Sequence, residues 1–182
     1  MGSSKSAQAL ITQFNTEWMR CVASITTDAD GASIVKSRVG LFREADVIFP
    51  EDNLYDRYQA GEHYDVIIAD EAQFFTPEQI DQLRQIVDEA DLPVLCFGLR
   101  TDFLTHLFPG SRRLMELADS ITEIKTVCAC GSKATVNARL DASGTILTTG
   151  SQVFLGGNDS YVAMCHRCWR KKIQAQQKSN LN

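Results

Sequence analysis

The feature that most constrains the fold is a buried strand followed by a well-marked helix and a second apolar strand. Residues 65–70 form a continuous apolar run that ends in acid, and residues 93–98 form another run of strand length, which we also expect to be buried. Between them, Thr76, Pro77 and Gln79 supply the N-cap, the first-turn proline and the capping-box glutamine of a predicted helix. Such alternation is typical of parallel βαβ units. The sequence therefore predicts an α/β fold, a parallel sheet with flanking helices.

Further elements extend this pattern along the chain. We expect a helix over residues 5–17, a strand over 19–25, a polar segment to about residue 38, a short helix capped by Ser111, and a strand over 121–127. After Cys128 the pattern changes to short β segments around a hairpin turn at 141–144 and a glycine-containing loop at 150–159. We expect an α/β domain at 1–127, a small domain at 128–172 and a polar tail at 173–182.

Charge and hydropathy exclude several classes of protein. The 182 residues carry a net charge of −5, which argues against a broad cationic face for nucleic acid. No acid follows Asp159, so a local phosphate site near Arg167 and Arg170 stays open beside the interpretation as a solvated helix end. No apolar run is long enough to span a bilayer and no export signal precedes residue 20. We expect a cytoplasmic protein with neither nucleic-acid nor membrane partners.

The six cysteines separate into two kinds. Cys21 and Cys96 lie in apolar runs and are expected to be core residues. The other four form Cys-x-Cys, 34 intervening residues and Cys-x-x-Cys: they are Cys128, Cys130, Cys165 and Cys168. Four thiolates at this spacing suit one structural Zn²⁺, and Gly131 permits the tight backbone of a metal knuckle. The alternatives are four reduced thiols, or a site in which His166 replaces one cysteine.

A pair of acids ends the strand at 65–70. Asp70 can hold Mg²⁺, while Glu71 can take a proton from an attacking hydroxyl. Acids at strand ends also occur as simple turn residues, so the pair alone leaves both interpretations open.

The first residues resemble the end of a phosphate-binding P-loop, G-x-x-x-x-G-K-[ST]. Lys5-Ser6 opens the predicted first helix, as phosphate binding at a helix N-terminus requires. Two departures stand out: Ser4 replaces the glycine before the lysine, and the first glycine of the motif would lie upstream of Met1.

Taken together, these motifs resemble the zinc-containing, type II thymidine kinases. The resemblance rests on Asp70-Glu-Ala-Gln-Phe-Phe75, Gly98-Leu-Arg-Thr-Asp-Phe103, Leu155-Gly-Gly-Asn158 before Tyr161, and the cysteine layout. It covers residues 2–172 and implies a P-loop-type sheet with a small zinc-ribbon-like lasso domain. It also implies transfer of the γ-phosphate of ATP to the 5′-hydroxyl of thymidine, with Mg²⁺ and a structural Zn²⁺. Family members are commonly homotetramers inhibited by thymidine triphosphate, and the resemblance implies both properties here.

The resemblance also assigns roles to individual residues. Glu71 would be the general base. Binding of ATP and Mg²⁺ would fall to Gly2, Ser3, Ser4, Lys5, Ser6, Asp70 and Gln73. Thymidine would be bound by Leu99, Phe103, Gln152, Val153, Phe154 and Tyr161, the last four from the lasso loop at about 150–161. For Leu99 and Phe103, ordinary core packing is the alternative.

Departures from the family pattern keep two other classes open. The strand before the P-loop is missing, and residues 26–31 contain acids but no arginine. We therefore expect the functional protein to begin upstream of Met1. One alternative is a kinase-fold protein with impaired catalysis, because of the incomplete P-loop. A remote alternative is a zinc-ribbon protein that binds nucleic acid through its basic C-terminal region.

Overall fold

The structure, a computed structural model, describes residues 22–24, 34–36, 42–44, 46–61, 65–152 and 161–179. The chain divides into two compact units. One, here called the α/β unit, contains the described residues up to Arg100 together with Phe108–Ile121. The other, here called the cysteine lobe, contains Thr101–Leu107 and the described residues from 122 onward. The predicted helix over 5–17 and the P-loop residues lie outside the described part of the chain.

Parallel strands form the α/β unit, as the sequence predicts. Strand β1 (Val22–Ser24) pairs in parallel with β4 (Asp46–Ile48), and β5 (Ile67–Ala69) pairs in parallel with β6 (Val94–Cys96). Strands β1 and β5 also contact each other. The polar segment after residue 25 contains strand β2 (Ile34–Lys36), which the sequence did not indicate; it pairs with β3 (Phe42–Glu44) in antiparallel register.

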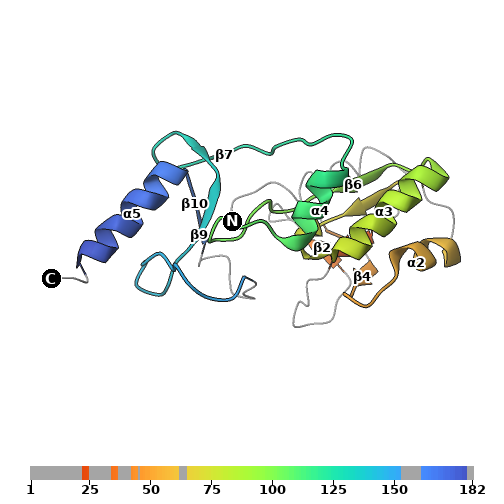
Figure 1. Cartoon of the computed structure of the whole chain (residues 1–182), viewed down its shortest axis with the longest axis horizontal. Helices are drawn as coiled ribbons and strands as arrows, with labels where there is room; N and C mark the ends of the chain where they lie inside the picture. The colour runs from red at the N-terminus through yellow and green to blue at the C-terminus, as the bar shows by residue number, and fades with distance from the viewer. Residues whose placement is uncertain are drawn as a thin grey trace. The chain divides into compact units, whose positions relative to one another are not determined.

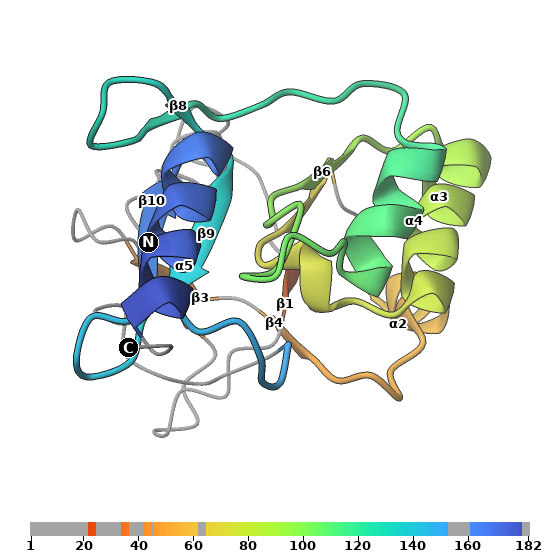
Figure 2. The same ribbon diagram turned by 60° about the vertical axis from the view of Figure 1, so that its left-hand side comes forward.

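Helices α2 (Leu54–Ala60), α3 (Pro77–Ala90) and α4 (Pro109–Leu117) pack as neighbours in this unit (Figures 1 and 2). Helix α3 begins as predicted: the Thr76 hydroxyl accepts a hydrogen bond from the Gln79 amide, and the Gln79 side chain accepts one from the Thr76 amide. This reciprocal capping box satisfies two of the amides that a helix start leaves unpaired.

The core of the α/β unit lies between these helices and one face of β5 and β6. Alternation along β5 sends Ile67 and Ala69 to this face and Val66 and Ile68 to the other. The buried members of the main cluster are Ile48, Leu54, Ile67, Ala69, Ala72, Phe75, Ile80, Leu83, Ile86 and Leu92. The site at the carboxyl end of β5 is thus built on a continuous apolar base.

Three sequence-based expectations about elements are wrong. Strand β6 is not fully buried, because Leu95 points away from the helix-covered face and is 37% exposed. Ser111 does not cap helix α4; Phe108 occupies the N-cap, Pro109 begins the helix, and the Ser111 hydroxyl instead donates to the Leu99 carbonyl. The strand expected over 121–127 is only Thr126–Val127, since the residues before it have no strand partner in the described chain.

Short antiparallel pairs build the cysteine lobe. Strand β7 (Thr126–Val127) pairs with β8 (Lys133–Ala134), and β9 (Val136–Arg139) pairs with β10 (Tyr161–Met164). Helix α5 (His166–Ser179) follows β10 and includes residues expected to be part of a polar tail. The segment Thr101–Leu107 joins this unit as a small hairpin, closed by a bridge between Thr101 and Leu107.

The predicted hairpin turn at 141–144 is present in the cysteine lobe. The Asp141 carboxylate accepts hydrogen bonds from the amides of Ser143 and Thr145, and Gly144 adopts a φ of +79°. Glycine is favoured there because side-chain-bearing residues rarely adopt positive φ. Among the helices that the structure describes, none has the length and apolar character needed to cross a bilayer.

Candidate active site and metal centre

Two acids stand at the carboxyl end of β5, where parallel sheets commonly hold their ligands. Asp70 is buried and its carboxylate accepts the Glu71 amide at 3.0 Å. Glu71 adopts a left-handed backbone, with φ 50° and ψ 34°, and starts the short 3₁₀ helix η1 (Ala72–Phe74). A left-handed conformation is uncommon for a residue with a side chain and often marks a functional site.

The turn at Glu71 brings the Gln73 amide back onto the Glu71 carboxylate. Gln73 Nε2 donates to Glu71 Oε2 at 2.5 Å, while Gln73 Oε1 accepts the Leu99 amide at 2.8 Å. Gln73 is only 1% exposed, so both ends of its amide need partners inside the protein. The carboxylate of Glu71 is therefore held by a side chain that is itself fixed to the backbone after β6.

Glycine at position 98 makes this arrangement possible. A Cβ there would lie 2.8 Å from Gln73 Oε1 and 3.1 Å from the Gln73 backbone nitrogen. Helix α4 supports the same region: Ser111 Oγ donates to the Leu99 carbonyl at 2.6 Å, and a Cβ on Gly110 would lie 2.4 Å from the Phe75 carbonyl oxygen. Close backbone approach thus fixes both η1 and the segment that follows β6.

A second group of predicted residues lies in the cysteine lobe. Phe103 is 2% exposed, and its neighbour Asp102 accepts a hydrogen bond from Gln152 Nε2 at 3.0 Å. Tyr161 begins β10, paired in register with Arg139. Val153 and Phe154, like the predicted phosphate-binding residues Gly2 to Ser6, lie outside the described residues.

The four predicted cysteines come together in the cysteine lobe. Their Sγ atoms all lie within 4.8 Å of one another, and Cys130 Sγ is 3.7 Å from Cys165 Sγ. Sulfurs at about 2.3 Å from a tetrahedral zinc are separated by roughly 3.8 Å, so the donor set and spacing fit that metal. His166 is not part of the cluster; its ring packs edge-on against Trp169, with centroids 5.3 Å apart.

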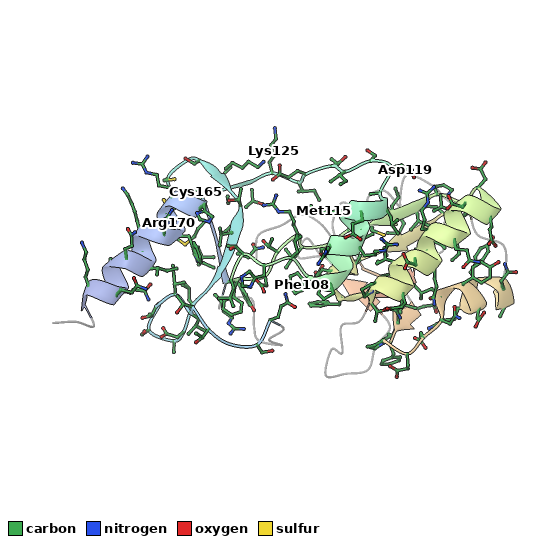
Figure 3. The ribbon with its side chains drawn as sticks, in the orientation of Figure 1. Phe108, Met115, Asp119, Lys125, Cys165 and Arg170 are labelled. Atoms are coloured by element: carbon green, nitrogen blue, oxygen red, sulfur yellow. The ribbon has the colours of Figure 1, made fainter. Side chains whose placement is uncertain are left out.

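The local backbone explains how the cysteines converge. Cys128 and Cys130 flank a turn in which the Gly131 amide donates to the Cys128 carbonyl, with Gly131 at a φ of +85°. Cys165 directly precedes α5, where Figure 3 shows it with further sulfur atoms beside it. Its sulfur accepts the Cys168 amide at 3.4 Å. The turn predicted at Gly131 is confirmed by the Gly131 hydrogen bond to Cys128 and by the positive φ of Gly131.

Hydrogen bonding shifts the pKa values of two of the thiols in opposite directions. Hydrogen bonds from Ser132 lower the pKa of the Cys130 thiol to about 6. Hydrogen bonding to Cys130, followed by that to Cys165, raises the pKa of Cys168 to about 12. Several thiolates in so small a volume repel one another, and a divalent cation is the usual means of stabilising them together.

Comparison with known proteins identifies the family. The sequence matches the thymidine kinase family over residues 1–169. The chain belongs to the thymidine kinase family. A thymidine kinase of Yersinia pseudotuberculosis is 43% identical over 184 residues, covering 96% of this chain and 93% of its own. Those of Ruegeria pomeroyi and Shewanella oneidensis are 48% and 44% identical, covering 78% and 80% of this chain and 73% and 78% of their own.

Membership of the thymidine kinase family, a family of phosphotransferases, agrees with the resemblance stated from the motifs. The matched range includes the acid pair, the Gly98–Phe103 motif and the four cysteines. The sequence indicated Gln73 but not Arg139 or the role of Ser111, whose hydrogen-bond partners lie 12 residues away along the chain. Asp102 was also not indicated; it accepts the nearby amides of Leu104 and His106, and only its contact with Gln152 is distant along the chain.

Proposed function

We propose that the protein transfers the γ-phosphate of ATP to the 5′-hydroxyl of thymidine, with Glu71 as general base. Family membership supports the reaction. The observation that carries the role of Glu71 is its carboxylate at the end of β5, held by the buried amide of Gln73. A base must be within hydrogen-bond reach of the proton it takes, so a fixed carboxylate is an advantage.

The nucleotide side of the reaction would be served by the P-loop residues and Asp70. Gly2, Ser3, Ser4, Lys5 and Ser6 would bind the phosphates, with Ser6 and Asp70 holding Mg²⁺. When bound, the ion neutralises charge on the transferred phosphoryl group. Gln73 was predicted as a ligand on this side; its amide already has Glu71 and Leu99 as partners, which favours a role in holding the base.

The nucleoside would be bound by Leu99, Phe103, Tyr161 and the main chain of residues 152–154. We assign the cysteine cluster to a structural Zn²⁺, because four sulfur ligands close a tetrahedral site and leave no position for substrate. A cytoplasmic homotetramer with thymidine triphosphate as feedback inhibitor remains part of this proposal, carried by the resemblance alone.

Phosphoryl transfer from Mg-ATP tests the proposal directly. Thymidine is the substrate, deoxycytidine the control, and Glu71→Gln the variant; the new amide can still accept the Gln73 hydrogen bond but cannot take a proton. We expect kcat for thymidine to fall by about 10²–10⁴-fold in the variant, with no phosphorylation of deoxycytidine by either protein. Equal activity in both proteins would remove Glu71 from the mechanism.

An altered P-loop residue supports a second candidate, a kinase-fold protein with impaired catalysis. Ser4 stands where the motif has the glycine before the lysine. This candidate predicts thymidine binding without turnover in a folded, zinc-loaded sample. Titration calorimetry with thymidine, run beside the kinase assay, separates the two candidates.

A further inference from the structure

A buried guanidinium lies in the cysteine lobe and belongs neither to the acid pair nor to the four-cysteine cluster. Arg139 ends strand β9 and is only 6% exposed. Burying a charged group is costly unless its donors are engaged. Its Nη1 donates to the Ser151 carbonyl at 3.1 Å, at the beginning of the lasso loop.

The same guanidinium stacks on a predicted thymidine contact. Its central carbon lies 3.9 Å from the centroid of the Phe103 ring. Contacts between a cation and an aromatic face are favourable, and more so when water is excluded. Phe103 is 2% exposed, so this contact is shielded from water.

Gly150 passes close beside Arg139 in a backbone conformation that favours glycine. A Cβ on Gly150 would lie 2.4 Å from Arg139 Nη2, and the residue has a φ of +130°. The hairpin Gly144 provides a contrast, since it also has a positive φ but no atom within 4 Å of its Cβ position. The loop therefore has a glycine where its φ is positive and where any Cβ would require the Arg139 guanidinium to shift.

A second set of contacts ties the same two segments together. Asp102, 5% exposed, accepts the amides of Leu104 and His106 on Oδ1, both at 2.9 Å. Its Oδ2 accepts Gln152 Nε2 at 3.0 Å. The hairpin Thr101–Leu107 and residues 150–152 are thus joined through Arg139, through Asp102 and by a longer hydrogen bond from Gln152 Nε2 to the Leu107 carbonyl at 3.4 Å.

We propose that Arg139 is a positioning residue for nucleoside recognition, holding Phe103 and the start of the lasso loop as one element. Tyr161, opposite Arg139 in the β9–β10 register, lies at the other end of that loop. The inference rests on the proposed function, because Phe103, Gln152 and Tyr161 matter only as thymidine contacts. It predicts that Arg139 governs thymidine affinity and not the phosphoryl-transfer step.

The test compares Arg139→Met, Arg139→Lys and Gly150→Ala with the wild-type protein. Controls are Arg112→Met, which removes a well-exposed charge, and Gly144→Ala, which alters a glycine of positive φ in open space. Readouts are KM for thymidine and for ATP, kcat, thymidine binding by calorimetry, zinc content, and hydrogen exchange of the peptide spanning 101–107 in the free protein.

We expect KM for thymidine to rise about tenfold or more in Arg139→Met and Gly150→Ala, with kcat and KM for ATP within about twofold. Arg139→Lys should lie between, since lysine keeps the charge but loses the planar stack and fork. Hydrogen exchange at 101–107 should rise in parallel. Both control variants should match the wild type in these readouts.

Unchanged thymidine KM in Arg139→Met, or a fall in kcat and ATP affinity equal to the loss of thymidine affinity, would overturn the inference. If Arg139→Met loses zinc, Gly150→Ala and Arg139→Lys decide the question by the same criteria. A wild-type protein that neither binds nor phosphorylates thymidine would overturn the proposed function, and the inference with it. Wild-type activity with unaltered variants would overturn the inference alone.

Discussion

The α/β unit and the cysteine lobe hold their functional side chains by different means. In the α/β unit, the Glu71–Gln73 pair rests on a cluster of ten buried apolar residues. In the described part of the cysteine lobe, the buried apolar side chains are few: Phe103, Cys128, Val136, Ala138, Ile146 and Cys165. There, Arg139, Asp102 and the cysteine cluster supply much of the tertiary contact. One unit depends on its hydrophobic core, the other on polar contacts and on a cluster of four cysteines assigned above to a structural metal.

Removal of the metal should give the largest difference in folding stability between the two units. Structural zinc contributes apparent free energies of about 10–16 kcal/mol in small domains, which the described core of the cysteine lobe cannot replace. We expect chelation, or Cys165→Ser, to abolish amide protection in residues 122–152 while helix α3 stays protected. Hydrogen exchange with mass spectrometry and zinc analysis measures this. Equal loss in α3 would contradict the comparison; Cys96→Ser, which should keep its zinc, is the control.

Two buried glutamines of the α/β unit allow positioning of the Glu71 carboxylate to be distinguished from a contribution to folding stability. Gln73 and Gln79 are each 1% exposed with both ends of the amide bonded. Gln73→Ala should lower kcat by about 10–100-fold, because the Glu71 carboxylate loses its fixed donor. Gln79→Ala should keep kcat and lose about 1–3 kcal/mol of stability. Steady-state kinetics and urea unfolding measure both, and the same kinetic loss in both variants would remove the distinction.

Two glycines test how tightly each unit is packed. Gly110→Ala places a methyl group 2.4 Å from the Phe75 carbonyl oxygen and should cost roughly 1–3 kcal/mol or more. Gly144→Ala meets no atom within 4 Å and should cost only about 1 kcal/mol, from its positive φ. Urea unfolding of each variant gives the values. A larger cost at Gly144 would reverse the expected order.

Thiol reactivity gives the smallest expected effect. Burial raises the pKa of the Cys96 thiol to about 12, so the thiolate fraction at pH 8 is roughly 10⁻⁴. We expect no labelling of Cys96 by iodoacetamide in the native protein. Its folded form binds a proton more tightly than the unfolded form, so this group's contribution to stability falls as pH rises above about 8.5. Peptide mapping after labelling checks the first point; rapid native labelling at Cys96 would contradict the raised pKa of this thiol.

Short sequence patterns predicted the features that depend on residues close together in the sequence or on characteristic residue spacing. The capping box at Thr76 and Gln79, the turn at Gly131 and the four-cysteine cluster all appear as expected. Each can be recognised from the types of a few residues and the spacing between them. The parallel pairing of β5 and β6 likewise follows from two apolar runs separated by a helix.

Prediction failed where a side chain's partner lies far along the chain. Serine is a favoured N-cap residue. The Ser111 hydroxyl nevertheless donates to the Leu99 carbonyl, because the helix already starts at Pro109. Arg139 gave no signal as a site residue, since its contacts come from residues 103 and 151. The strand expected over 121–127 is only Thr126–Val127, because the residues before it find no pairing partner in the described chain.

The hairpin Thr101–Leu107 has a consequence for how this protein can be divided. It belongs to the cysteine lobe, although the chain on either side of it, up to Arg100 and from Phe108, belongs to the α/β unit. A single cut before residue 122 would therefore leave Phe103 and Asp102 on a fragment without their partners. Because Thr101 and Leu107 form a bridge, the ends of the hairpin meet, and a short turn could replace it. Separating either unit from the other therefore requires two changes to the chain, one at the hairpin Thr101–Leu107 and one near residue 122.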